Sequence, residues 1–225
     1  MEPVATFQHQ GLGRDLQKTL LTSWYQGLAT AKERGRPVAY LFVPGNVAEL
    51  LRVFDFELVY PEVNALQCGV RKFSDKHILK AEEQGYSSDV CGYVKSDIGM
   101  MLEGNLGPSG VKLPPPDLLL CTFSGCTTFI KWFEALSHYY KVPLVMLDVP
   151  YLREGKITEQ DRQYVISQLK DVAGICQRIT GKKLDMERLS EICRLSAEAE
   201  DLWVDILQTS KRKPSPFEAY FEAVS

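Results

Sequence analysis

The sequence lacks several patterns that mark common protein classes. It has no Cys-x-x-Cys pair, which argues against a thioredoxin motif or a zinc ribbon, and no P-loop for nucleotide phosphates. No apolar run approaches the roughly 20 residues that span a bilayer, and the first residues lack the basic and apolar segments of a signal peptide. A net charge of -3 and a pI near 5.7 leave no basic excess to attract nucleic acids or anionic membranes. We therefore expect a cytoplasmic protein that binds neither nucleic acid nor membrane.

What is present is the composition of an ordinary globular chain. Its 225 residues are 45% hydrophobic and 24% charged, which suffices for one sizeable α/β domain with helical additions. Disulfides are rare in the cytoplasm, so the six cysteines are expected to be free thiols. Each is either a small apolar packing residue or a reactive or metal-binding group. The six are Cys68, Cys91, Cys121, Cys126, Cys176 and Cys193.

Strand and helix patterns alternate along the chain, which predicts an α/β fold with an open parallel sheet and covering helices. An N-terminal helix and long C-terminal helices are expected in addition. Around residue 61 the periodicity is weaker, and no element is assigned there. The expected strands are 37–43, 56–60, 117–123 and 143–149, and the expected long helices are 15–35, 158–180 and 185–209.

The same patterns divide the chain into three parts. Residues 1–36 form a helical segment, residues 37–155 form the α/β domain, and residues 156–225 form a second helical segment. A serine cap, a proline and an acidic residue at 215–218 make a good helix start shortly before the sequence stops. We expect the last segment to lead into a second α/β domain outside this chain, which would make the chain the N-terminal part of a longer polypeptide.

Cys126 follows the apolar run 118–123 and precedes a helical pattern. That position lies at the C-terminal end of a strand and the start of a helix, the sheet edge where open α/β folds bind ligands. A helix N-terminus favours negative charge, so a thiolate there becomes a better nucleophile or metal ligand. The alternative is a buried apolar packing residue. Cys121 lies within the strand itself and is expected to pack against a helix.

Cys91 is expected at a second helix start, because Ser87, Ser88 or Asp89 can cap a helix that begins beside it. Gly92 and Gly99 weaken that helix pattern, although glycine also permits close approach of the backbone to a bulky cofactor.

We predict that the sulfur atoms of Cys91 and Cys126 converge on one cavity at the sheet edge. Cys176 and Cys193 fall within long amphipathic patterns, remote from that cavity, and are expected to be packing residues.

Four segments of the sequence carry a resemblance to known proteins: residues 42–51, 85–99, 125–134 and 156–158. Together they resemble the family of benzoyl-CoA reductases and 2-hydroxyacyl-CoA dehydratases. The similarity runs in collinear order over nearly the whole chain and points to the cluster-carrying, substrate-binding subunits of the reductases. The family's subunits are substantially longer than this chain.

The resemblance implies a 4Fe-4S cluster held by three cysteines, of which Cys91 and Cys126 match the first two and the third lies outside this chain. It implies that Glu62 transfers protons, with an ordinary solvated glutamate as the alternative. It further implies an acyl-CoA substrate such as benzoyl-CoA, a homologous second cluster-carrying subunit, and ATP-hydrolysing partner subunits that activate the electrons. The expected reaction reduces the aromatic ring to a cyclic dienoyl-CoA.

Two rival interpretations stay open. One is a subunit of a 2-hydroxyacyl-CoA dehydratase, a lyase that uses the same cluster and a recycled electron. The other is a non-catalytic α/β module whose cysteines are structural or bind zinc.

Overall fold

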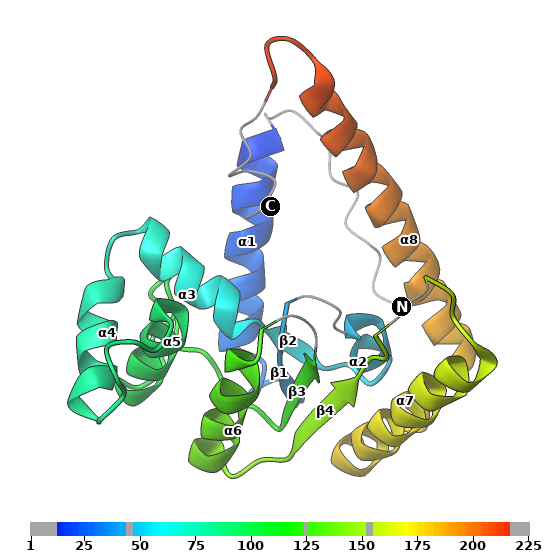
Figure 1. The fold of residues 1–225 in the computed structure, drawn as a ribbon, viewed down its shortest axis with the longest axis horizontal. Coiled ribbons are helices and arrows are strands. Elements are labelled where there is room, and N and C mark those ends of the chain that lie inside the picture. Colours follow the sequence, from blue (N-terminus) through cyan, green and yellow to red (C-terminus); the bar gives the residue numbers. More distant parts are fainter. Residues whose placement is uncertain (1–12, 44–46, 124–125, 152–154, 217–225) are drawn as a thin grey trace. The chain divides into compact units, whose positions relative to one another are not determined.

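The computed structural model describes residues 13–43, 47–123, 126–151 and 155–216 (Figure 1). The chain divides into two compact units, one drawn from residues 1–46 and 56–172 and the other from residues 47–55 and 173–225. The division into three parts and the further α/β domain beyond them stay predictions. The predicted helix start at 215–218 lies mostly outside the described residues.

The first unit is built on a parallel sheet of four strands in the order β2-β1-β3-β4. Tyr40 of β1 pairs with Val59 of β2 and Leu119 of β3, so β1 and β3 occupy the centre. Because all four strands run in one direction, their C-terminal ends lie at one edge. The predicted strands and the α/β fold class are thus confirmed. The strands are β1 (Val38–Leu41), β2 (Glu57–Val59), β3 (Leu118–Phe123) and β4 (Leu144–Asp148).

Helices join and cover these strands, and the predicted N-terminal and long C-terminal helices are confirmed. The first helix ends at Ala29 rather than near residue 35, because turns follow it and Gly35 adopts a left-handed φ of 64°. Two helices that the sequence patterns did not reveal, α3 and α4, fill the stretch of weak periodicity. The helices are α1 (Gly13–Ala29), α3 (Pro61–Val70), α4 (Ser74–Glu83), α5 (Gly92–Leu102), α6 (Thr128–Tyr140) and α7 (Glu159–Thr180).

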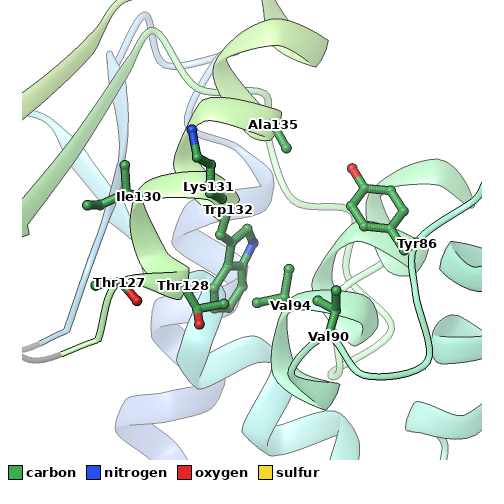
Figure 2. A pocket seen from close by; sticks show the side chains of 9 residues that line it. All are labelled: Tyr86, Val90, Val94, Thr127, Thr128, Ile130, Lys131, Trp132 and Ala135. Atoms are coloured by element: carbon green, nitrogen blue, oxygen red, sulfur yellow. The ribbon is translucent and has the colours of Figure 1, made fainter.

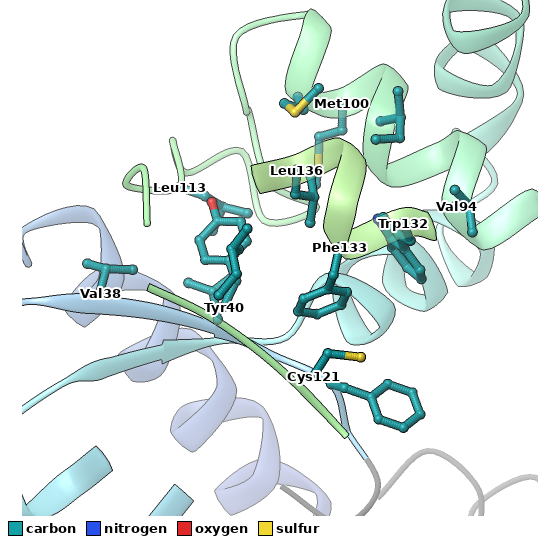
Figure 3. Packing of buried hydrophobic residues seen from close by; sticks show 14 of the residues in the cluster. Val38, Tyr40, Val94, Met100, Leu113, Cys121, Trp132, Phe133 and Leu136 are labelled. Carbon is teal, nitrogen blue, oxygen red and sulfur yellow. The ribbon is translucent and has the colours of Figure 1, made fainter. Parts of the chain in front are cut away.

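The core of this unit lies between the central strands and helices α5 and α6 (Figure 3). Phe133 and Leu136 of α6 pack into one cluster with Tyr40 of β1 and Cys121 of β3. Met100 brings α5 into the same cluster. Since burying one large apolar side chain contributes about 1.5 to 3 kcal/mol, this cluster fixes both helices on the sheet.

Gly99 marks the closest approach of α5 to its neighbour α4. A Cβ atom added to Gly99 would lie 1.8 Å from the carbonyl oxygen of His77 and 2.7 Å from its Cα atom. No real pair of atoms tolerates such distances, so only glycine fits there. The close approach that Gly99 permits is therefore made by the backbone of α4.

The second unit combines α2 (Ala48–Val53), the last residues of α7 and α8 (Met186–Gln208). Asp55, after α2, accepts hydrogen bonds from Lys182 and, at 2.6 Å, from Arg188 of α8. The helix α8 begins at Met186, one residue after the predicted start. Asp185 is its N-cap residue, whose side chain accepts a bond of 3.0 Å from the Arg188 amide. None of its described residues is buried.

The described residues contain no helix that is long and apolar enough to cross a membrane.

Candidate functional site

Two of the cysteines stand at helix starts in the first unit. Cys91 is the N-cap residue of α5, and its carbonyl oxygen accepts a bond of 3.1 Å from the Lys95 amide. Cys126 directly precedes Thr127, the N-cap residue of α6. Both thiols are exposed. The positive end of a helix dipole thus lies at each position.

A hollow of about 470 Å³ lies between the two segments that carry these cysteines (Figure 2). Val90, which precedes Cys91, forms one wall, and Thr127, which follows Cys126, forms the opposite one. The tertiary fold therefore brings both cysteine segments to one hollow although they are far apart in the sequence. The convergence of the two sulfur atoms themselves stays a prediction.

The other thiols differ from this pair. Cys121 is fully buried in the core, where burial raises the pKa of its thiol to about 11. Cys176 is buried as well, and burial raises its pKa to about 12, so both thiols stay protonated and act as packing groups. Cys193 is exposed on α8, and the expectation that it packs in a core is wrong. The reason is that the described part of the chain leaves the apolar stripe of α8 uncovered.

Behind the hollow lies a buried acid that the sequence patterns did not single out. The indole Nε1 of Trp132, a lining residue, donates a hydrogen bond of 2.8 Å to Oδ2 of Asp97 on α5. Asp97 is 3% exposed, and this burial raises the pKa of its carboxyl to about 7. An aspartate amid the buried apolar positions of α5 is the sequence signal that would have pointed to it.

Three titratable groups that interact with Asp97 offer its carboxyl no compensating positive charge. They are Tyr40 of β1, Tyr140 of α6 and Cys68 of α3. Burial raises the pKa of each of these three groups, so none is ionised at neutral pH. Ionised Asp97 is therefore unfavourable in the folded protein.

We expect ionisation of Asp97 to lower the free energy of unfolding of the wild type as the pH rises. The substitution Asp97→Asn should remove this contribution. The carboxyl binds its proton more tightly when folded than when unfolded, so its stabilising effect is complete below about pH 4 and is lost as the pH rises through about 7. The difference in free energy of unfolding between wild type and Asp97→Asn should change by roughly 4 kcal/mol from pH 4 to pH 8. Urea unfolding at several pH values measures it.

The matched control is Asp75→Asn, since Asp75 is exposed in the first turn of α4. It should follow the wild-type pH profile. If the difference in free energy of unfolding between wild type and Asp97→Asn stayed constant from pH 4 to pH 8, it would contradict the burial of the Asp97 carboxyl.

Comparison with known proteins decides the family. The sequence model of the family described as 2-hydroxyglutaryl-CoA dehydratase, D-component, matches residues 44–224. The chain belongs to this family. The matched range includes both cysteines at helix starts, the hollow between them and Glu62.

Several curated relatives in the family are similar over most of this chain. It is 48% identical to one of the subunits of benzoyl-CoA reductase from Thauera aromatica over 209 residues, which cover 92% of this chain and 48% of the relative. It is 33% identical to the (R)-2-hydroxyisocaproyl-CoA dehydratase alpha subunit of Clostridioides difficile, over 89% of this chain and 49% of the relative. The (R)-phenyllactyl-CoA dehydratase alpha subunit of Clostridium sporogenes is 32% identical over 84% of this chain and 46% of the relative. The chain thus spans about half the length of these relatives.

The residues present fit part of the ligand set of an iron-sulfur cluster. Such a cluster needs deprotonated thiols, and Cys91 and Cys126 are exposed and stand at positive helix ends. Each is next in sequence to a residue that lines the hollow. Among the residues that the structure describes, no three His, Cys, Asp or Glu side chains are grouped to hold a metal ion. The third ligand, which the resemblance places outside this chain, stays a prediction.

Glu62 occupies the first turn of α3, directly after β2. Only β1 separates β2 from β3, and the C-terminal ends of both strands point to the same edge of the sheet. Val59 at the end of β2 is level with Leu119, so β3 extends four residues further, to Phe123, before the chain reaches Cys126. Glu62 is half-buried, and burial raises the pKa of its carboxyl. The role of Glu62 in proton transfer stays a prediction.

Proposed function

We propose that this chain is part of a benzoyl-CoA reductase subunit, which delivers electrons to the ring of benzoyl-CoA and yields a cyclic dienoyl-CoA. The observation that carries the proposal is the 48% identity to a benzoyl-CoA reductase subunit over 92% of the chain, against 33% for a dehydratase subunit over a similar range. Both named relatives act on thioesters of coenzyme A, so the substrate class follows under either reaction.

In this proposal Cys91 and Cys126 are two of the three thiolate ligands of a 4Fe-4S cluster. When bound, the cluster would supply low-potential electrons to the substrate. The chain's own task is to hold the two thiolates at the ends of α5 and α6, which are fixed on the sheet by the buried core.

Glu62 is proposed as the proton donor. Reduction of a ring adds protons as well as electrons, so a group that keeps its proton near neutral pH is required. Burial raises the pKa of the Glu62 carboxyl, which shifts it in the direction that this role needs. Its place at the same sheet edge as Cys126 supports the assignment.

The proposed assembly contains further subunits. The sequence has no P-loop, so ATP hydrolysis is assigned to partner subunits that activate the electrons. A homologous second cluster-carrying subunit completes the proposed enzyme, and the cytoplasm is its proposed location.

The second candidate is a 2-hydroxyacyl-CoA dehydratase subunit. It is favoured by two dehydratase alpha subunits that are 33% and 32% identical over most of the chain. Such an enzyme would eliminate water from a 2-hydroxyacyl-CoA with the same pair of cysteines.

The deciding experiment uses the full-length protein, purified without oxygen together with its partner subunits. We expect ATP-dependent conversion of benzoyl-CoA to a cyclic dienoyl-CoA, followed by mass spectrometry. Dehydration of a 2-hydroxyacyl-CoA without ring reduction would assign the protein to the dehydratases. An absence of iron by EPR and visible spectroscopy would instead support the non-catalytic module.

A further inference from the structure

We infer that Lys95 is a positioning residue, whose buried amino group holds the segment 85–90 in place and thereby fixes Cys91 as a ligand. This inference rests on the proposed function, which supplies the cluster. It goes further in naming the side chain that fixes one of the two cysteine segments.

Lys95 is a buried lysine whose amino group makes two hydrogen bonds. It lies on α5, one turn after Cys91, and is 5% exposed. Its Nζ donates a bond of 2.6 Å to Oε1 of Glu82 and one of 2.8 Å to the carbonyl oxygen of Ser88. Lysines are almost never fully buried unless they are paired, because the charged group loses its hydration. The two bonds offset this loss, so the amino group is tied to these two partners.

Burial sets this ion pair apart from a neighbouring one at the surface. Lys80 of α4 is bonded to Glu83 at 3.0 Å, and its side chain is 38% exposed. Exposed pairs of that kind contribute little, because water and salt screen them. The side chain of Lys95 is 6% exposed, and removing one partner of a buried pair leaves the other charge uncompensated. The position of the Lys95 amino group is therefore the more tightly determined of the two.

The bonds of Lys95 connect three successive parts of the chain. Glu82 belongs to the last turn of α4, and Ser88 lies in the segment that leads from α4 to α5. The amide of Tyr86 donates a bond of 3.3 Å to the carbonyl oxygen of Ala81, which holds the beginning of this segment on α4. Lys95 holds its middle, and so determines where the chain enters α5.

Cys91 lies between two bonds made by the same lysine. The backbone amide of Lys95 donates a bond of 3.1 Å to the Cys91 carbonyl oxygen, and its amino group bonds Ser88, three residues before Cys91. Side chains on a helix lean toward its N-terminus, so Lys95 reaches back past Cys91. Lys95 thus supports the backbone on both sides of the proposed ligand, as residues behind the ligands of a metal site do.

The first test compares Lys95→Met with Lys80→Met in the iron-free, full-length protein. Methionine is a flexible apolar residue that fills the space of the lysine stem without its amino group. Lys80 is the matched control, because the same substitution there removes an exposed ion pair. Amide hydrogen exchange, followed by mass spectrometry, measures the segment 85–91 and, for comparison, the segment 127–135 at the start of α6.

We expect Lys95→Met to speed exchange in 85–91 at least about tenfold, the effect of losing one hydrogen bond from a charged donor, and to leave 127–135 within about twofold of wild type. Lys80→Met should change neither segment. If Lys95→Met does not fold, Glu82→Gln, which keeps an acceptor oxygen in the same space, should speed exchange in 85–91 at least about threefold. Unchanged exchange in 85–91, or an equal rise in both segments, would overturn the inference, because a general loss of stability loosens both.

The second test uses the iron-loaded protein. Lys95→Met should lose iron to EDTA at least about tenfold faster than wild type and change the g values of the EPR signal, while Lys80→Met matches wild type. Faster exchange in 85–91 without either of these changes would overturn the assignment of Lys95 to the support of a ligand. A wild type that never binds iron would refute the proposed function, whereas the exchange measurement would still decide whether Lys95 holds the segment.

Discussion

Replacement of either Cys91 or Cys126 by alanine in the full-length protein is expected to lower the iron content and to abolish ATP-dependent reduction of benzoyl-CoA. Both thiols are exposed at helix starts beside one hollow, and alanine offers no electron pair to iron. Loss of a ligand removes a fixed point of the cluster, so the effect should be close to complete in each variant. Iron analysis and EPR of anaerobically purified protein measure it independently of turnover.

Cys193→Ala is the matched control, because Cys193 is also an exposed thiol but lies on α8 in the second unit. It should retain iron and activity. If removal of any thiol damaged the protein in general, iron content and activity would fall in all three variants alike. Full iron content and normal turnover in Cys126→Ala would show that this residue is no ligand.

The second large effect is expected for Gly99→Ala, which should destabilise the protein by at least about 3 kcal/mol, the upper end of the usual cost of overpacking. The added Cβ atom would overlap the backbone of α4 at His77, and a backbone cannot move aside as a flexible side chain can. The change would force α5, which starts at Cys91, away from α4. Urea unfolding of wild type and variant gives the free energy directly.

Gly92→Ala tests the same substitution on the same helix. Its Cβ atom would lie 3.9 Å from Cδ1 of Ile78, an ordinary contact with a flexible side chain. We expect its free energy of unfolding to stay within about 1 kcal/mol of wild type. Equal free energies of unfolding for Gly99→Ala and wild type would contradict the close approach of the α4 backbone to Gly99.

The strands could be predicted because buried parallel strands are short, continuous apolar runs bounded by polar and glycine residues. Helices α7 and α8 could be predicted because their apolar stripes repeat over many turns. Helices α3 and α4 have ten residues each, and the stretch around residue 61 lacked a periodic pattern strong enough to assign them. Local propensity is a weak signal in such short elements, and tertiary packing decides them.

The site was foreseen where it depends on local sequence. The strand and helix patterns place Cys126 before a helix. Cys91 also lies at a helix start, as expected, but it is the N-cap residue itself, and no side chain caps this helix. The hollow could not be foreseen, since it arises only when the segments 86–94 and 127–135 are brought together. The pairing of Asp97 with Trp132 spans 35 positions in the sequence and has no local signature.

Cys193 shows what an amphipathic pattern cannot predict. An amphipathic pattern indicates which face of a helix is apolar, but it does not say what covers that face. In the described residues α8 buries none of its side chains, and its exposed apolar residues include Leu195, Leu202 and Ile206. A packing role inferred from the pattern alone therefore failed for this thiol.

The most direct test of the central claim is an anomalous difference map at the iron edge, from crystals of the full-length subunit grown without oxygen. The account predicts one iron-sulfur cluster with iron atoms within bonding distance of the Cys91 and Cys126 sulfur atoms. Iron bound only elsewhere, or a full-length subunit without iron, would contradict it.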